Sequence, residues 1–81
     1  MNVTCYGQMA NPRRDITTEY YETASKQAGI RARLLRAAGF RVTSSNMGNQ
    51  VTRVGLVKLT MLTIHGDADN LPPVNVELGV R

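Results

Sequence analysis

Residues 50–64 read QVTRVGLVKLTMLTI, and this stretch decides the fold. Its high content of Val, Leu, Ile and Thr, without Pro, is typical of a long β-strand. Because side chains alternate between the two faces of a strand, the apolar residues divide into two rows. The odd row is Val57, Leu59, Met61 and Thr63, and the even row is Val54, Leu56, Leu62 and Ile64. Both faces of this strand therefore need cover.

Lys58 decides which row we place under a helix. It belongs to the even row, and an ammonium group buried without a partner costs several kcal/mol. We therefore expect the odd row to face the helix, which leaves Leu56, Leu62 and Ile64 on the open face. A contiguous apolar patch commonly marks an interface, so we predict contact with a partner or a second copy there. The alternative is internal cover, through a bulge at Gly55 or the C-terminal strand.

One helix is expected upstream of this strand. Asp15, Thr17 or Thr18 can cap its start. Gly39 suits its end, because glycine readily adopts the left-handed conformation that follows many helices. The apolar side is mostly alanine and the other side is charged, as in an amphipathic helix packed on a sheet. Gly29 in its middle permits a break.

The remaining elements are shorter. Residues 2–7 and 40–43 are rich in strand formers, residues 44–49 (SSNMGN) are typical of a turn, and residues 74–80 alternate as a strand. Joined in chain order, these elements predict the order β-α-β-β-β. No linker divides the chain, so we expect one α+β domain over residues 1–81. It would hold a small antiparallel sheet of three or four strands with one amphipathic helix on one face.

The charge of the chain is concentrated in its middle. The formal net charge is +4, but residues 26–58 hold seven Lys and Arg and no Asp or Glu. Arginine donates two parallel hydrogen bonds to a carboxylate or phosphate, so this block suits an anionic partner. The residues predicted to contact such a partner are Lys26, Arg33, Arg36, Arg41 and Arg53. The alternative is an ordinary solvated helix face. Arg31, at the edge of the apolar side, is expected to pack its stem and extend its head to water, the alternative being an ion pair with Glu77 or with an acid of a partner.

Few residues could carry catalytic or metal chemistry. Cys5 and His65 alone cannot complete a zinc site, and no third residue orients them as nucleophile and base. His65, Asp67 and Asp69 alternate in a loop that lacks the bidentate Glu of a calcium-binding EF-hand. The glycines match neither a phosphate-binding loop nor a dinucleotide-binding motif. We therefore predict no catalytic residue, metal or cofactor, and a protein that is not an enzyme.

A short basic chain without catalytic groups is expected to act by binding. We predict a protein-interaction module, regulatory or inhibitory, that uses an apolar sheet face and a basic helix face against an acidic protein partner. The alternative is a nucleic-acid-binding module, although the chain has only 4 aromatic residues to stack on bases. A chain of 81 residues buries a small core, which favours a homodimer. No stretch suits a membrane span or a signal peptide, so we expect a cytoplasmic protein.

Overall fold

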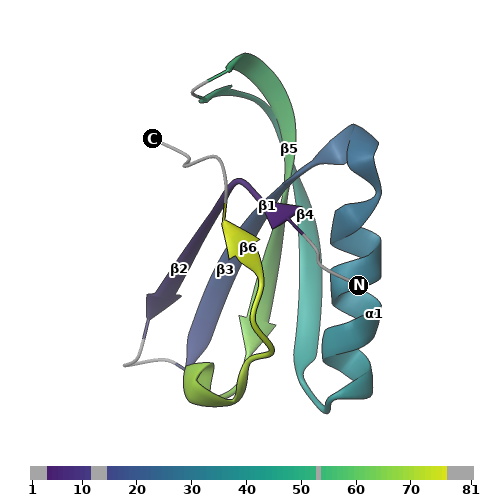
Figure 1. The fold of residues 1–81 in the computed structure, drawn as a ribbon, viewed down its shortest axis with the longest axis vertical. Helices are drawn as coiled ribbons and strands as arrows, with labels where there is room; N and C mark the ends of the chain where they lie inside the picture. The colour runs from purple at the N-terminus through teal and green to yellow at the C-terminus, as the bar shows by residue number, and fades with distance from the viewer. Residues whose placement is uncertain (1–3, 12–14, 53, 77–81) are drawn as a thin grey trace.

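The computed structural model describes residues 4–11, 15–52 and 54–76 (Figure 1). In chain order its elements are β1 (Thr4–Cys5), β2 (Gly7–Asn11), β3 (Ile16–Glu22), the 3₁₀ turn η1 (Thr23–Ser25), α1 (Gln27–Ala37), β4 (Arg41–Thr52), β5 (Gly55–His65), the 3₁₀ turn η2 (Ala68–Asn70) and β6 (Asn75–Val76). Strands β2, β3, β5 and β4 form, in this spatial order, one antiparallel sheet on which α1 packs. Strands β1 and β6 form a separate parallel pair. The predicted α+β class is confirmed, with the order β-β-α-β-β for the sheet and its helix.

The predicted order is wrong before residue 26, where β3 replaces the first half of the expected helix. Every second side chain of β3 is buried, namely Thr17, Glu19 and Tyr21, which is the period of a strand. Two of these inward positions are polar, so the sequence lacks the apolar alternation that usually marks a half-buried strand. The helix begins only at Gln27, after Lys26 adopts a left-handed conformation with a φ of 63°.

The end of α1 lies where the sequence predicts. The helix ends at Ala37, and Gly39 follows with a φ of 96°, the conformation that glycine adopts most easily after a helix. The Phe40 N–H donates to the Leu35 carbonyl at 3.0 Å and closes the last turn. The helix passes through Gly29 without a break, and its 11 residues make it about 16 Å long.

The hairpin between β4 and β5 is longer than predicted. Residues 44–49 belong to β4, and its pairing with β5 continues to Thr52 opposite Gly55. The glycine and asparagines that indicated a turn form a β-bulge instead, between Asn46 and Gly48. Gly48 has a φ of 71°, and its N–H donates to the Asn46 Oδ1 at 2.9 Å. The predicted returning strand over residues 50–64 therefore begins too early, because residues 50–52 belong to β4 and β5 begins only at Gly55.

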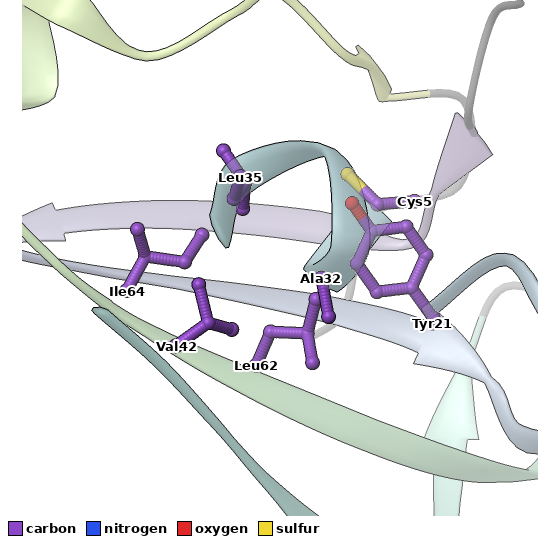
Figure 2. Packing of buried hydrophobic residues seen from close by; sticks show 7 residues of the cluster. All are labelled: Cys5, Tyr21, Ala32, Leu35, Val42, Leu62 and Ile64. Atoms are coloured by element: carbon purple, nitrogen blue, oxygen red, sulfur yellow. The ribbon is translucent and has the colours of Figure 1, made fainter. Parts of the chain in front are cut away.

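The main core lies between α1 and the sheet. Figure 2 shows Ala32 and Leu35 of the helix above Val42 of β4 and Leu62 and Ile64 of β5. All five side chains are buried. Buried Cys5 and Tyr21, from β1 and β3, extend this cluster.

The even row of β5 therefore faces the helix, and the prediction that the odd row does so is wrong. Leu62 and Ile64 lie in the core, whereas Lys58 of the same row is exposed. The physical reason is the length of α1, which is too short to cover all of β5, so Lys58 lies outside the covered part of that face. Leu59 of the odd row is also fully buried but does not belong to this cluster.

The predicted C-terminal strand is described only in part. Asn75 and Val76 form β6, and residues 77–81 lie outside the described part of the chain. The predicted first strand is divided, because β1 and β2 are separated by a bend at Tyr6. Within the described ranges, no helix has the length and apolar composition needed to cross a bilayer.

Candidate functional site

Two of the predicted basic residues lie together on the exposed side of α1. Arg33 and Arg36 are one turn apart on the helix, and both are exposed. The Arg36 Nη2 donates to the Val42 carbonyl of β4 at 2.9 Å, which joins the end of the helix to the edge of the sheet. Arg33 has no hydrogen-bond or ion-pair partner among the residues that the structure describes.

Both arginines line a groove between α1 and the β4 side of the sheet. Its volume is about 320 Å³. The lining residues are Ala28, Gly29, Ala32, Arg33, Arg36, Ser44, Thr60 and Leu62. The groove exists because these helix positions are small: a Cβ placed on Gly29 would meet no atom within 4 Å. No acidic residue belongs to this lining, so neither guanidinium charge is neutralised within the groove.

The other predicted basic residues do not join this pair. Lys26 precedes the helix and is exposed at its other end, about 10 Å from Arg33 along the axis. Strand alternation places Arg41 opposite His65 on the face away from the helix, because its neighbour Val42 points into the core. Arg53 lies outside the described residues.

The predicted apolar interface does not lie on an open sheet face. Leu62 and Ile64 are each 1% exposed and contribute to the core under α1, so their predicted place on the open face is wrong. Leu56 is 68% exposed, beside exposed Val51 and Val54 at the reversal of the hairpin. The exposed apolar residues of this set therefore gather at the hairpin end.

Sequence reasoning missed a buried ion pair between β3 and α1. The Arg31 Nε and Nη2 donate to the Glu19 Oε1 and Oε2, both at 2.9 Å, and both side chains are fully buried. Two further side chains donate to the Glu19 carboxylate, the Tyr21 hydroxyl at 2.5 Å and the Gln8 amide at 2.8 Å. The Arg31 Nη2 also donates to the Pro72 carbonyl at 2.8 Å. The prediction that Arg31 extends to water is therefore wrong. The alternation of side chains in β3 gave no sign of this pair, because two of the three inward positions are polar.

The surroundings of this ion pair fix the protonation of its neighbours. Burial alone would lower the pKa of Arg31, but the hydrogen bonds and charge of Glu19 outweigh it and raise that pKa. Burial, and then the hydrogen bond to Glu19, raise the pKa of Tyr21. Burial, and then the charge of Glu19, raise the pKa of Cys5 to about 11. Cys5 is therefore a neutral thiol at neutral pH, not an activated nucleophile.

Metal ligands do not gather in the described part of the chain, which holds no group of three or more His, Cys, Asp or Glu residues able to bind one ion. The buried ion pair is enclosed, so its chemistry is structural. The groove beside α1 is open and carries unpaired charge, so it is the candidate binding site. A comparison with protein-family models, with curated proteins and with solved structures finds no match for this chain.

Proposed function

We propose that this protein is a small non-enzymatic binding module that holds an acidic segment of a protein partner in the groove between α1 and β4. The observation that carries the proposal is the pair Arg33 and Arg36 at a groove without acidic lining. Arginine forks bind carboxylates bidentately, and the apolar wall from Ala32 and Leu62 accepts aliphatic stems. Regulation or inhibition of the partner would follow from occupying that segment.

The aromatic residues favour a protein partner over nucleic acid. Single-stranded nucleic acids are bound largely by stacking bases on exposed aromatic side chains. Tyr6 and Tyr21 are buried, and Tyr20 and Phe40 are only partly exposed. Arg41 lies on the far face of the sheet, so the predicted cations that the structure describes do not form one continuous track for a phosphate backbone.

Fluorescence anisotropy would test the proposal with two labelled probes of equal charge, an oligoglutamate peptide and a single-stranded DNA oligonucleotide. We expect the peptide to bind, and the double variant Arg33→Ala/Arg36→Ala to weaken binding by about tenfold or more, because two charge-assisted contacts are lost. Arg41→Ala is the matched control, since it removes the same charge from the opposite face and should change the affinity by less than about twofold.

Two outcomes would contradict this function. One is the absence of peptide binding at low salt. The other is tighter binding of the DNA probe, with an affinity that falls steeply with the logarithm of the salt concentration. The second outcome would favour the nucleic-acid-binding alternative.

A further inference from the structure

Strand β4 is an edge of the sheet and its outer side has no partner among the described strands. The strand order ends at β4, which pairs only with β5, and α1 runs alongside it (Figure 1). Residues 42–52 contain no charged residue and no proline. Edge strands of monomeric proteins usually carry such residues to prevent pairing with another chain. This edge is therefore chemically open to an added strand.

The backbone geometry identifies the residues that face the free edge. The Tyr20 carbonyl accepts from the Tyr6 N–H at 2.6 Å, so the peptide groups of Tyr20 point away from β5. Two residues directly opposite each other in an antiparallel pair turn their peptide groups either both toward each other or both away. Met61 lies opposite Tyr20, so it turns its own groups away from β3 and toward β4. Along each strand this direction alternates from one residue to the next. Met61 lies opposite Ser45, whose groups therefore point to β5. The N–H and C=O of Ser44 consequently point to the free edge.

A second observation supports this assignment. Arg36 reaches the Val42 carbonyl from the helix, and Val42 is two residues from Ser44, so its peptide groups point to the same side. The bulge between Asn46 and Gly48 interrupts the regular strand. Because Arg36 already occupies the Val42 carbonyl, the usable edge covers residues 43–46, about 13 Å of extended chain. It borders the groove that Arg33 and Arg36 line.

We infer that the partner segment binds as an extended strand that pairs with residues 43–46 of β4. This inference rests on the proposed function and adds how the partner binds. Backbone hydrogen bonds to Ser44 supply affinity, and alternate side chains of the added strand point into the groove. There they meet Arg33 and Arg36, so the segment carries acidic residues at alternate positions.

The spacing of the two arginines suits this pattern. Arg33 and Arg36 are separated by about 4.5 Å along the helix axis. Alternate side chains of an extended strand are about 7 Å apart, a difference that flexible arginine side chains span. A second copy of this chain is a poorer occupant. Pairing two β4 edges about a two-fold axis perpendicular to the sheet would place both pairs of arginines on one side, where they repel.

Two labelled hexapeptides of equal composition test the pattern, TEVETV with alternate glutamates and TEEVTV with adjacent ones. We expect TEVETV to bind the full chain about fivefold more tightly than TEEVTV. In an added strand, the two carboxylates of TEVETV lie on the same side, whereas those of TEEVTV lie on opposite sides. Equal affinities would overturn the alternate acidic pattern.

Amide methylation of TEVETV tests the backbone pairing. Only every second peptide group of an added strand faces β4, so methylating one alternate set of amides should weaken binding by about tenfold. Methylating the other set is the matched control and should change binding by less than about twofold. If both sets act alike while Arg33→Ala/Arg36→Ala still weakens binding, strand addition is overturned and the groove function stands. If no peptide binds, both proposals fail.

Ser44→Pro and Ser44→Ala test the same contact from the protein side. Proline removes the outward N–H and is tolerated at the solvent side of an edge strand, whereas alanine retains the N–H. We expect about tenfold weaker binding of TEVETV for Ser44→Pro and less than about twofold change for Ser44→Ala, with circular dichroism confirming that both are folded. Equal effects of the two substitutions would overturn the pairing. So would a protein that is a dimer in the absence of peptide and becomes a monomer in Ser44→Pro, because a second copy would then occupy the β4 edge.

Discussion

Arg31 and Arg33 lie two residues apart on α1 and have opposite surroundings. Arg31 is fully buried, holds Glu19 through two hydrogen bonds of 2.9 Å and reaches Pro72. Arg33 is exposed beside an open groove and has no partner in the described part of the chain. The same type of residue therefore has two different roles on one short helix. The inward arginine holds the fold together, and the outward one is free to bind.

The first test of this contrast removes the inward arginine. We expect Arg31→Ala to lower the free energy of unfolding by about 3–5 kcal/mol, because Glu19 would remain buried without its partner. Arg33→Ala is the matched control and should change it by less than about 0.5 kcal/mol. Urea denaturation followed by circular dichroism measures both. Equal losses would show that the two arginines are not distinguished by burial.

An apolar replacement of the pair sharpens the same contrast. The double variant Glu19→Leu/Arg31→Met removes both buried charges, so it should recover most of the stability lost in Arg31→Ala. A double variant as unstable as Arg31→Ala would show that the hydrogen bonds to Tyr21, Gln8 and Pro72, rather than the buried charge, account for the loss.

A smaller effect is expected at alkaline pH. The pKa of Cys5 is raised from 9.0 to about 11, so the unfolded chain loses this proton first. The stabilisation is fully present below pH 9 and is lost as the pH rises toward 11, on the order of 2 kcal/mol. Burial raises the pKa of Tyr21 as well and adds a loss in the same direction.

Urea titrations between pH 8 and pH 11 would measure this loss. We expect Cys5→Ala to lower stability at pH 8 but to flatten the decline above pH 9, because the titrating thiol is gone. His65→Ala, which leaves both groups in place, should decline as steeply as the parent chain. An unchanged decline in Cys5→Ala would assign the alkaline loss to other groups.

The smallest effect on stability is expected at the hairpin end. Leu56 is 68% exposed, so Leu56→Glu should change the free energy of unfolding of the monomer by less than about 0.5 kcal/mol. The predicted homodimer now depends on Leu56, since Leu62 and Ile64 lie in the core. Light scattering should show a dimer for the parent chain and a monomer for the Leu56→Glu variant. A parent chain that is monomeric at high concentration would contradict the homodimer.

Two features were predictable because they rest on local chemistry. The apolar run over residues 50–64 indicated a strand, and its residues 55–64 lie in β5, while Gly39 marked the end of α1. Strand β3 was not predicted, because two of its inward residues are polar. Glu19 can point into the core only because Arg31 pairs with it there. Residues 44–49 have the composition of a turn but contain a β-bulge. A bulge can use a glycine in the left-handed conformation, as a turn does.

The candidate site was predictable in its chemistry but not in its membership. The concentration of arginine without acids is visible in the sequence and includes Arg33 and Arg36. Their separation from Arg41 depends on which face each strand residue takes. Their proximity to the β4 edge depends on the position of α1, which long-range packing sets.

Composition and local pattern alone therefore determine the α+β class, the long apolar strand, the helix end and the basic centre of this chain, because each follows from residues close in sequence. Only the tertiary structure decides that Glu19 and Arg31 meet, that Leu62 and Ile64 face the helix, and that two arginines border an open strand edge. The physical reason is that burial and charge pairing depend on contacts between segments far apart in the chain.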